Sequence, residues 1–196
     1  MLMEFGALYP LIVLAGFAFI GASIKYIDSA FDDNVFDKRK AYALAGACGI
    51  CMGAFVAFDE YAAAIFIGIV ASVALAKKID NLAFTMGTAI VIMVPAVLTS
   101  SITLHGLPIA LIAIAGIGDE YGNNIVDSGL LRNPLAAAFF KYRLNMEFMM
   151  GALVLIGIFP AIYWVGLISF DGAYHLVGSY AARAKYPLRN TVFSAV

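Results

Sequence analysis

Charge is scarce in this sequence. Only 13% of the 196 residues are Asp, Glu, Lys or Arg, whereas 63% are hydrophobic and the mean hydropathy is +0.94. A soluble domain carries about 25% charged residues, so the charges here are too few to cover a water-facing surface. Disorder is excluded too, because disordered chains combine low hydrophobicity with high net charge. The net charge of −1 gives no basic field for a nucleic-acid partner.

Cysteine and histidine are also rare. Two cysteines rule out a disulfide scaffold, and the two histidines, His105 and His175, show no metal-binding spacing. Cys48 and Cys51 form a Cys-x-x-Cys within an apolar, glycine-rich stretch. We interpret this stretch as a helix-packing surface, with redox chemistry or metal ligation as the alternative. No phosphate-binding loop, Gly-x-Gly-x-x-Gly or Gly-x-Ser-x-Gly motif is present.

Long apolar segments are what the sequence has instead. A membrane-spanning helix needs about 20 mostly apolar residues. The sequence contains about six segments that meet this requirement. We therefore expect an all-α polytopic transmembrane helix bundle, with residues 1–196 as a single domain and both termini on the outer side. The expected spans are Tyr9–Ile27, Tyr42–Phe58, Tyr61–Ala76, Leu82–Leu104, Leu107–Asp127 and Phe148–Phe170, the last kinked at Pro160.

The positive charges predict the orientation. These spans place nine of the twelve Lys and Arg residues on one side, which should be cytoplasmic. Arg183, Lys185 and Arg189 would lie outside, where Asp171 would open a tail and residues 173–182 would form an interfacial helix. Asn133 and Pro134 predict a helix start, either of a separate helix at the cytoplasmic interface or of the last span itself. The expected location is the cell membrane, with the lipid bilayer as surroundings.

Acidic residues gather at the cytoplasmic ends of the first, third and fifth spans. Asp28 and Asp32 would be one helical turn apart, and Asp119, Asn123 and Asp127 recur every four residues. Like charges at this spacing repel, so water, basic neighbours or a divalent cation must offset the repulsion. Ionisable groups at membrane depth are functional candidates, and carboxylates suit Mg²⁺. The alternative is that these acids are only solvated loop residues.

This pattern resembles the UbiA-type intramembrane prenyltransferase superfamily. That family has two aspartate-rich cytoplasmic motifs, the first roughly Asn-Asp-x-x-Asp-x-x-x-Asp and the second of an Asp-x-x-x-Asp type. The corresponding stretches are residues 27–37 and 118–127, and residues 76–81 match a lysine-containing loop between them. Asp28 and Asp32 are four residues apart where the family has three, and this chain is shorter than the family's.

The resemblance implies a Mg²⁺-dependent transferase that acts on an isoprenoid or other lipid diphosphate. It implies four aspartates as catalytic residues and metal ligands: Asp28, Asp32, Asp119 and Asp127. The expected substrate contacts are Lys78, Asn123 and Arg132. Two other functions stay open, namely a non-catalytic integral membrane subunit of a larger complex with partner subunits, and a cation transporter or channel.

Overall fold

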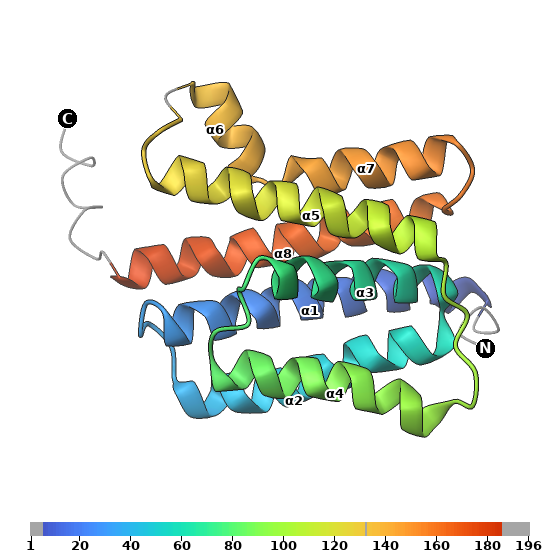
Figure 1. Ribbon diagram of the computed structural model, residues 1–196. Coiled ribbons are helices and arrows are strands. Elements are labelled where there is room, and N and C mark those ends of the chain that lie inside the picture. The colour runs from blue at the N-terminus through green and yellow to red at the C-terminus, as the bar shows by residue number, and fades with distance from the viewer. Residues whose placement is uncertain (1–5, 132, 186–196) are drawn as a thin grey trace.

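The structure is a computed structural model that describes residues 6–131 and 133–185. Within these residues the chain forms eight α-helices and no strand, which confirms the prediction of an all-helical bundle (Figure 1). The helices are α1 (Tyr9–Phe31), α2 (Lys38–Phe58), α3 (Glu60–Leu75), α4 (Leu82–Leu98), α5 (Gly106–Asp127), α6 (Pro134–Lys141), α7 (Leu144–Leu155) and α8 (Ala161–Lys185).

The helices lie side by side along one common direction, except for the short α6 at one end (Figure 1). α1 packs most extensively against α8, α2 against α4, and α3 against α5. The helices α1, α3, α5 and α8 all end on the side of α6, and we call this side the charged end. The opposite end contains Asp59, between α2 and α3, and His105, at the start of α5.

Side-chain caps explain where several helices begin. The Asp59 carboxylate accepts hydrogen bonds from the backbone N–H groups of Tyr61 and Ala62, so a single residue separates α2 from α3. Asn133 caps α6 by accepting from the N–H groups of Leu135 and Ala136, which confirms the predicted helix start there. The tight hairpin and the short α6 therefore follow from local hydrogen bonding.

The core is aromatic and aliphatic near the middle of the bundle. Phe17, Phe55 and Phe66 pack together, with ring centroids 4.6–5.6 Å apart. Gly49 lies so close to α4 that a Cβ there would sit 2.7 Å from the Gly87 carbonyl oxygen. Small residues permit this close approach of the two helix backbones.

The predicted sixth span is wrong as a single helix. In place of one helix over residues 148–170, α7 and α8 run antiparallel (Figure 1). The chain reverses between Ile156 and Pro160. There Gly157 adopts φ 78°, a left-handed conformation that favours glycine, and Pro160 lacks the N–H that a continuing helix needs.

The reversal also changes where the end of α8 lies. Lys185 contacts Asp33 at 2.6 Å, and Tyr180 stacks on Phe36, so Arg183 and Lys185 lie at the charged end. Their predicted separation from the first acidic loop is therefore wrong. Asp171 is buried in the middle of α8 and does not open an outer tail, and residues 173–182 continue the same helix.

Two helical stretches, Gly6–Phe31 and Lys38–Phe58, are long and apolar enough to cross a membrane. Shorter apolar helices follow at Glu60–Leu75, Leu82–Leu98 and Leu144–Leu155. Every Lys and Arg within residues 6–131 and 133–185 belongs to a segment at the charged end. Arg132 and Arg189 lie outside the described residues.

Candidate functional site

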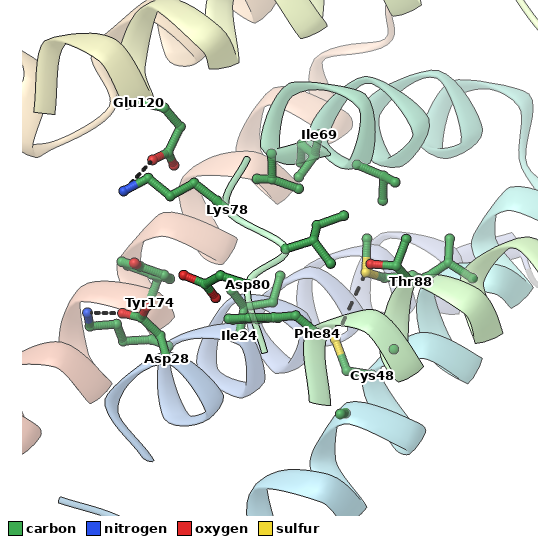
Figure 2. A pocket seen from close by; sticks show the side chains of 18 of the residues that line it. Ile24, Asp28, Cys48, Ile69, Lys78, Asp80, Phe84, Thr88, Glu120 and Tyr174 are labelled. Carbon is green, nitrogen blue, oxygen red and sulfur yellow. Dashed lines mark hydrogen bonds and ion pairs between the residues drawn. The ribbon is translucent and has the colours of Figure 1, made fainter. Parts of the chain in front are cut away.

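A cavity of about 320 Å³ opens at the charged end, among α1, α2, α3, α4, α5 and α8 (Figure 2). This volume is at the small end of the range for ligand pockets, about 300–1,000 Å³. Figure 2 shows acidic and basic side chains such as Asp28, Lys78 and Asp80 on one side of the cavity, and Phe84 and Cys48 on the other. The cavity therefore combines a charged mouth with an apolar interior.

The mouth contains more acids than cations. Three basic residues line it, namely Lys25, Lys78 and Arg143. Five acidic residues line it, namely Asp28, Asp32, Asp80, Glu120 and Asp127. The local excess of carboxylates is what attracts a cation, either alone or with a bound phosphate.

All three cations are already paired with acids. Lys25 Nζ lies 2.5 Å from the Asp28 carboxylate at the end of α1. The Arg143 guanidinium lies 2.8 Å from the Glu120 carboxylate of α5, and Lys78 Nζ lies 3.9 Å from the same group. The cations are thus held in place by α1 and α5 and face the cavity together.

Three carboxylates at the rim have no cation partner within the part of the chain that is described. Asp32, Asp80 and Asp127 are solvent-exposed where the cavity opens. Asp80 is bonded to the amide of Asn81 at 3.3 Å, and Asp127 to that of Asn123 at 3.5 Å. These side chains remain available to a ligand that carries positive charge.

Asp28 and Asp32 lie on the same side of α1, as their spacing of four residues predicts. Asp28 and Asp32 both line the cavity, one helical turn apart. Partial burial raises the pKa of Asp32 above its ordinary value, and the charge of Asp28, a hydrogen bond with Asp28 and the charge of Asp80 raise it further. This like-charge crowding would be relieved by a bound cation.

The structure brings most of the predicted site residues together. Asp28 and Asp32 come from the end of α1, Asn123 and Asp127 from α5, and Lys78 from the loop between α3 and α4. All five nevertheless line the same cavity. Their roles as metal ligands, catalytic groups and substrate contacts stay predictions. The predicted substrate contact Arg132 lies outside the described residues.

Asp119 is the exception. It is 2% exposed, and its two carboxylate oxygens accept hydrogen bonds from the backbone N–H groups of Asn145 and Met146 at the start of α7. Asp119 thus anchors α7 to α5 and does not line the cavity. Of the three residues that recur every four positions in α5, only Asn123 and Asp127 line the cavity.

Sequence reasoning missed several lining residues. Glu120 adjoins the predicted Asp119 and points to the cavity in its place, bound to Arg143. Asp80 lies in the loop already identified by its lysines. Tyr174 lies on α8, in a segment expected on the opposite side, so only the fold brings it here.

The donors suit Mg²⁺ only when a ligand contributes. Among residues 6–131 and 133–185, no three His, Cys, Asp or Glu side chains form a group that could hold a metal ion. Mg²⁺ is usually bound by one or two carboxylates together with waters and substrate phosphates. Asp28 and Asp32 provide two such carboxylates, so a magnesium ion that arrives with a phosphate fits the cavity better than a resident metal.

Comparisons of the chain with protein-family models, with curated proteins and with solved structures give no match. The resemblance to UbiA-type prenyltransferases therefore stays a prediction, and function is inferred from the cavity.

Proposed function

We propose that this is an integral membrane protein that acts on the magnesium complex of a lipid diphosphate, bound at the charged end of the bundle. The observation that carries the proposal is the cavity itself. Unpaired carboxylates and fixed cations line its mouth, and an apolar interior lies directly behind them. An amphiphile with a phosphate headgroup and a short apolar tail matches this arrangement, because its charged head fits the mouth and its tail fits the interior.

The membrane topology follows from the positive charges. The charged end faces the cytoplasm, because Lys and Arg accumulate on that side of membrane proteins. α1–α5, α7 and α8 then cross the membrane, giving seven passes in place of six, with α1 beginning outside and α8 ending inside. The 12 residues of α7 extend about 18 Å, so the turn at 156–160 completes its crossing.

The headgroup binds at the carboxylates. Asp28, Asp32 and Asp127 hold the magnesium complex, and Lys78 and Arg143 bind phosphate oxygens from the same side. Mg²⁺ supplied with the substrate stabilises charge on a departing diphosphate.

The tail binds against the apolar wall formed by residues such as Met52, Val73, Phe84 and Val91. That wall keeps water away from the carbon atom that bears the diphosphate. Exclusion of water protects a reactive carbon until an acceptor arrives. The proposed enzyme class is therefore a transferase of the isoprenoid or related lipid group.

The excess of acidic groups also favours a second function, a cation vestibule of a transporter or channel. However, Phe17, Phe55 and Phe66 pack together on the helix turns between the cavity and the opposite end of the bundle. A transporter would have to open this aromatic barrier. A protein that only packs against partner subunits needs no such cavity.

Direct binding tests the proposal. Purified protein in detergent is titrated with geranyl diphosphate, with and without Mg²⁺, and release of inorganic pyrophosphate is followed. We expect magnesium-dependent binding that Asp32→Asn and Asp127→Asn each weaken by about tenfold or more, the loss of one charge-assisted contact. The control is Glu60→Gln, which changes an exposed acid at the opposite end. The proposal is contradicted if the affinity does not depend on Mg²⁺, or if Glu60→Gln lowers the affinity as much as the two aspartate variants do.

A further inference from the structure

A second group of carboxyl side chains lies between α5, α7 and α8, away from the cavity lining. Asp171 of α8 is 6% exposed, and neither of its carboxylate oxygens receives a hydrogen bond from an N–H or hydroxyl group in the described residues. Glu147 of α7 accepts one, from the Trp164 indole at 2.9 Å, while its other oxygen has no such donor. The Glu147 and Asp171 carboxyl groups are within hydrogen-bonding reach of each other.

Arg143 connects this carboxyl pair to the cavity. Its guanidinium acts electrostatically on Asp171, forms the ion pair with Glu120, and lies 4.9 Å from the centre of the Tyr174 ring. Arg143 and Tyr174 both line the cavity, whereas Glu147 and Asp171 do not. The same cation therefore faces the headgroup on one side and the carboxyl pair on the other.

The other neighbours of the pair do not neutralise it. Asp119 is committed to the backbone of α7, and Lys25 of α1 approaches Tyr174 but is paired with Asp28. His175 lies one turn after Asp171, and its Nε2 has no hydrogen-bond partner in the described residues. The ionisable groups around the pair are thus Asp119, Glu120, Arg143, Tyr174 and His175.

We propose that Glu147 and Asp171 together bind a proton, and that Arg143 couples this proton to the charge in the cavity. Two carboxylates in contact inside an apolar bundle do not both ionise, because repulsion and loss of hydration add. A shared proton lets one carboxyl donate to the other and satisfies oxygens that otherwise lack a donor.

The coupling has a definite sign. The positive charge of Arg143 favours ionisation of the pair. An anionic headgroup that binds Arg143 weakens this effect, so the pair holds its proton more tightly and binding is accompanied by proton uptake. The coupling to the headgroup rests on the proposed function, whereas the proton site does not.

The proton site is tested without any ligand by infrared difference spectroscopy over a pH series, using the protein in detergent. We expect a C=O stretching band of a buried protonated carboxylic acid that Asp171→Asn and Glu147→Gln each remove or shift. The control, Asp37→Asn, changes an exposed acid that caps α2 and should leave the band unchanged. Absence of the band from the unmodified protein overturns the proposal, as does its persistence unchanged in both variants.

The coupling is tested with Arg143→Gln, again without ligand. Removal of the cation should move the disappearance of the band to higher pH by about one unit or more, the effect of an opposite charge at close range. Arg39→Gln, an exposed arginine of α2, should produce no movement. If the band disappears at the same pH in Arg143→Gln and Arg39→Gln, the coupling is overturned.

A final arm adds inorganic pyrophosphate with Mg²⁺ to the unmodified protein. If the ligand also moves the disappearance of the band to higher pH, the coupling extends to the headgroup. If the band and its Arg143 dependence are present but pyrophosphate does not bind, the proposed function fails and the proton site stands.

Discussion

The Arg143 guanidinium lies 2.8 Å from the Glu120 carboxylate, and this ion pair joins the turn before α7 to the middle of α5. Glu120 is 6% exposed and the Arg143 side chain is 22% exposed, so the pair is buried on the Glu120 side and half-buried on the Arg143 side. Because both residues line the cavity, one interaction holds the helices together and also sets the position of a cation at the mouth.

Replacement of Glu120 by Gln should destabilise the protein strongly. It leaves the partly buried guanidinium of Arg143, whose side chain is 22% exposed, without its counterion. Breaking a fully buried pair costs about 3–5 kcal/mol, so for this half-buried pair we expect about 2–3 kcal/mol. The measurement is the thermal unfolding midpoint in detergent. Glu60→Gln is the matched control, because Glu60 forms an exposed pair with His105 at 3.1 Å, where about 0–1 kcal/mol is expected. Equal shifts in the two variants would contradict a structural role for the buried pair.

Binding of the magnesium–diphosphate complex should weaken as the pH falls, and earlier than for an ordinary aspartate. The ligand requires the ionised form of Asp32, and the raised pKa of Asp32 means that protonation begins at higher pH. Asp80→Asn removes one of the charges that raise this pKa, so the fall in affinity should move to lower pH. The affinity of inorganic pyrophosphate with Mg²⁺ is measured across a pH series. The control, Asp37→Asn, keeps a capping side chain and should leave the profile in place.

Asp59 should contribute more to stability than another helix cap of the same kind. Its carboxylate caps α3, accepts the Tyr163 hydroxyl at 2.8 Å and also accepts the hydroxyl of Tyr9, so it links α1, α3 and α8. Asp59→Ala removes a cap worth about 1 kcal/mol and leaves buried hydroxyls unsatisfied, at about 1–3 kcal/mol more.

The comparison is with Asp37→Ala, which removes only an exposed cap. Unfolding midpoints in detergent should fall clearly further for Asp59→Ala than for Asp37→Ala. Indistinguishable midpoints would show that the contacts to α1 and α8 add nothing.

The deep wall of the cavity should discriminate between a lipid diphosphate and its headgroup alone. Val91 is 5% exposed and lines the apolar interior, so Val91→Phe should fill space needed by the tail. We expect the affinity for geranyl diphosphate to fall by about tenfold or more, while that for inorganic pyrophosphate is unchanged. Val97→Phe, at a residue that is 80% exposed, serves as the control. A parallel loss of both ligands would place the headgroup, not the tail, at Val91.

Much of the fold could be predicted from local sequence. The all-helical bundle and the cap at Asn133 are determined by neighbouring residues, and these two predictions are confirmed. The spacing of Asp28 and Asp32 was likewise enough to place both on one face of a helix. Sequence periodicity predicts these features because they depend only on residues one or two helical turns apart.

The remaining features depend on contacts between distant segments. The apolar stretch 148–170 reads as one span, and only packing decides that Gly157 and Pro160 reverse the chain. That reversal brings α8 back to the charged end with Tyr174. Arg143 has a left-handed backbone conformation, at φ 53°, and its side chain contacts Glu120. Hydropathy predicts neither the conformation nor the contact.

The most direct measurement of the account is protection of Cys48 from alkylation. Cys48 lines the cavity and is 4% exposed, whereas Cys51 does not line it. In a Cys51→Ala variant, geranyl diphosphate with Mg²⁺ should slow the reaction of Cys48 with a small thiol reagent, measured by mass spectrometry. In a Cys48→Ala variant, Cys51 should react at the same rate with and without the ligand. Equal reaction rates of Cys48 with and without saturating ligand would contradict a lipid diphosphate in this cavity.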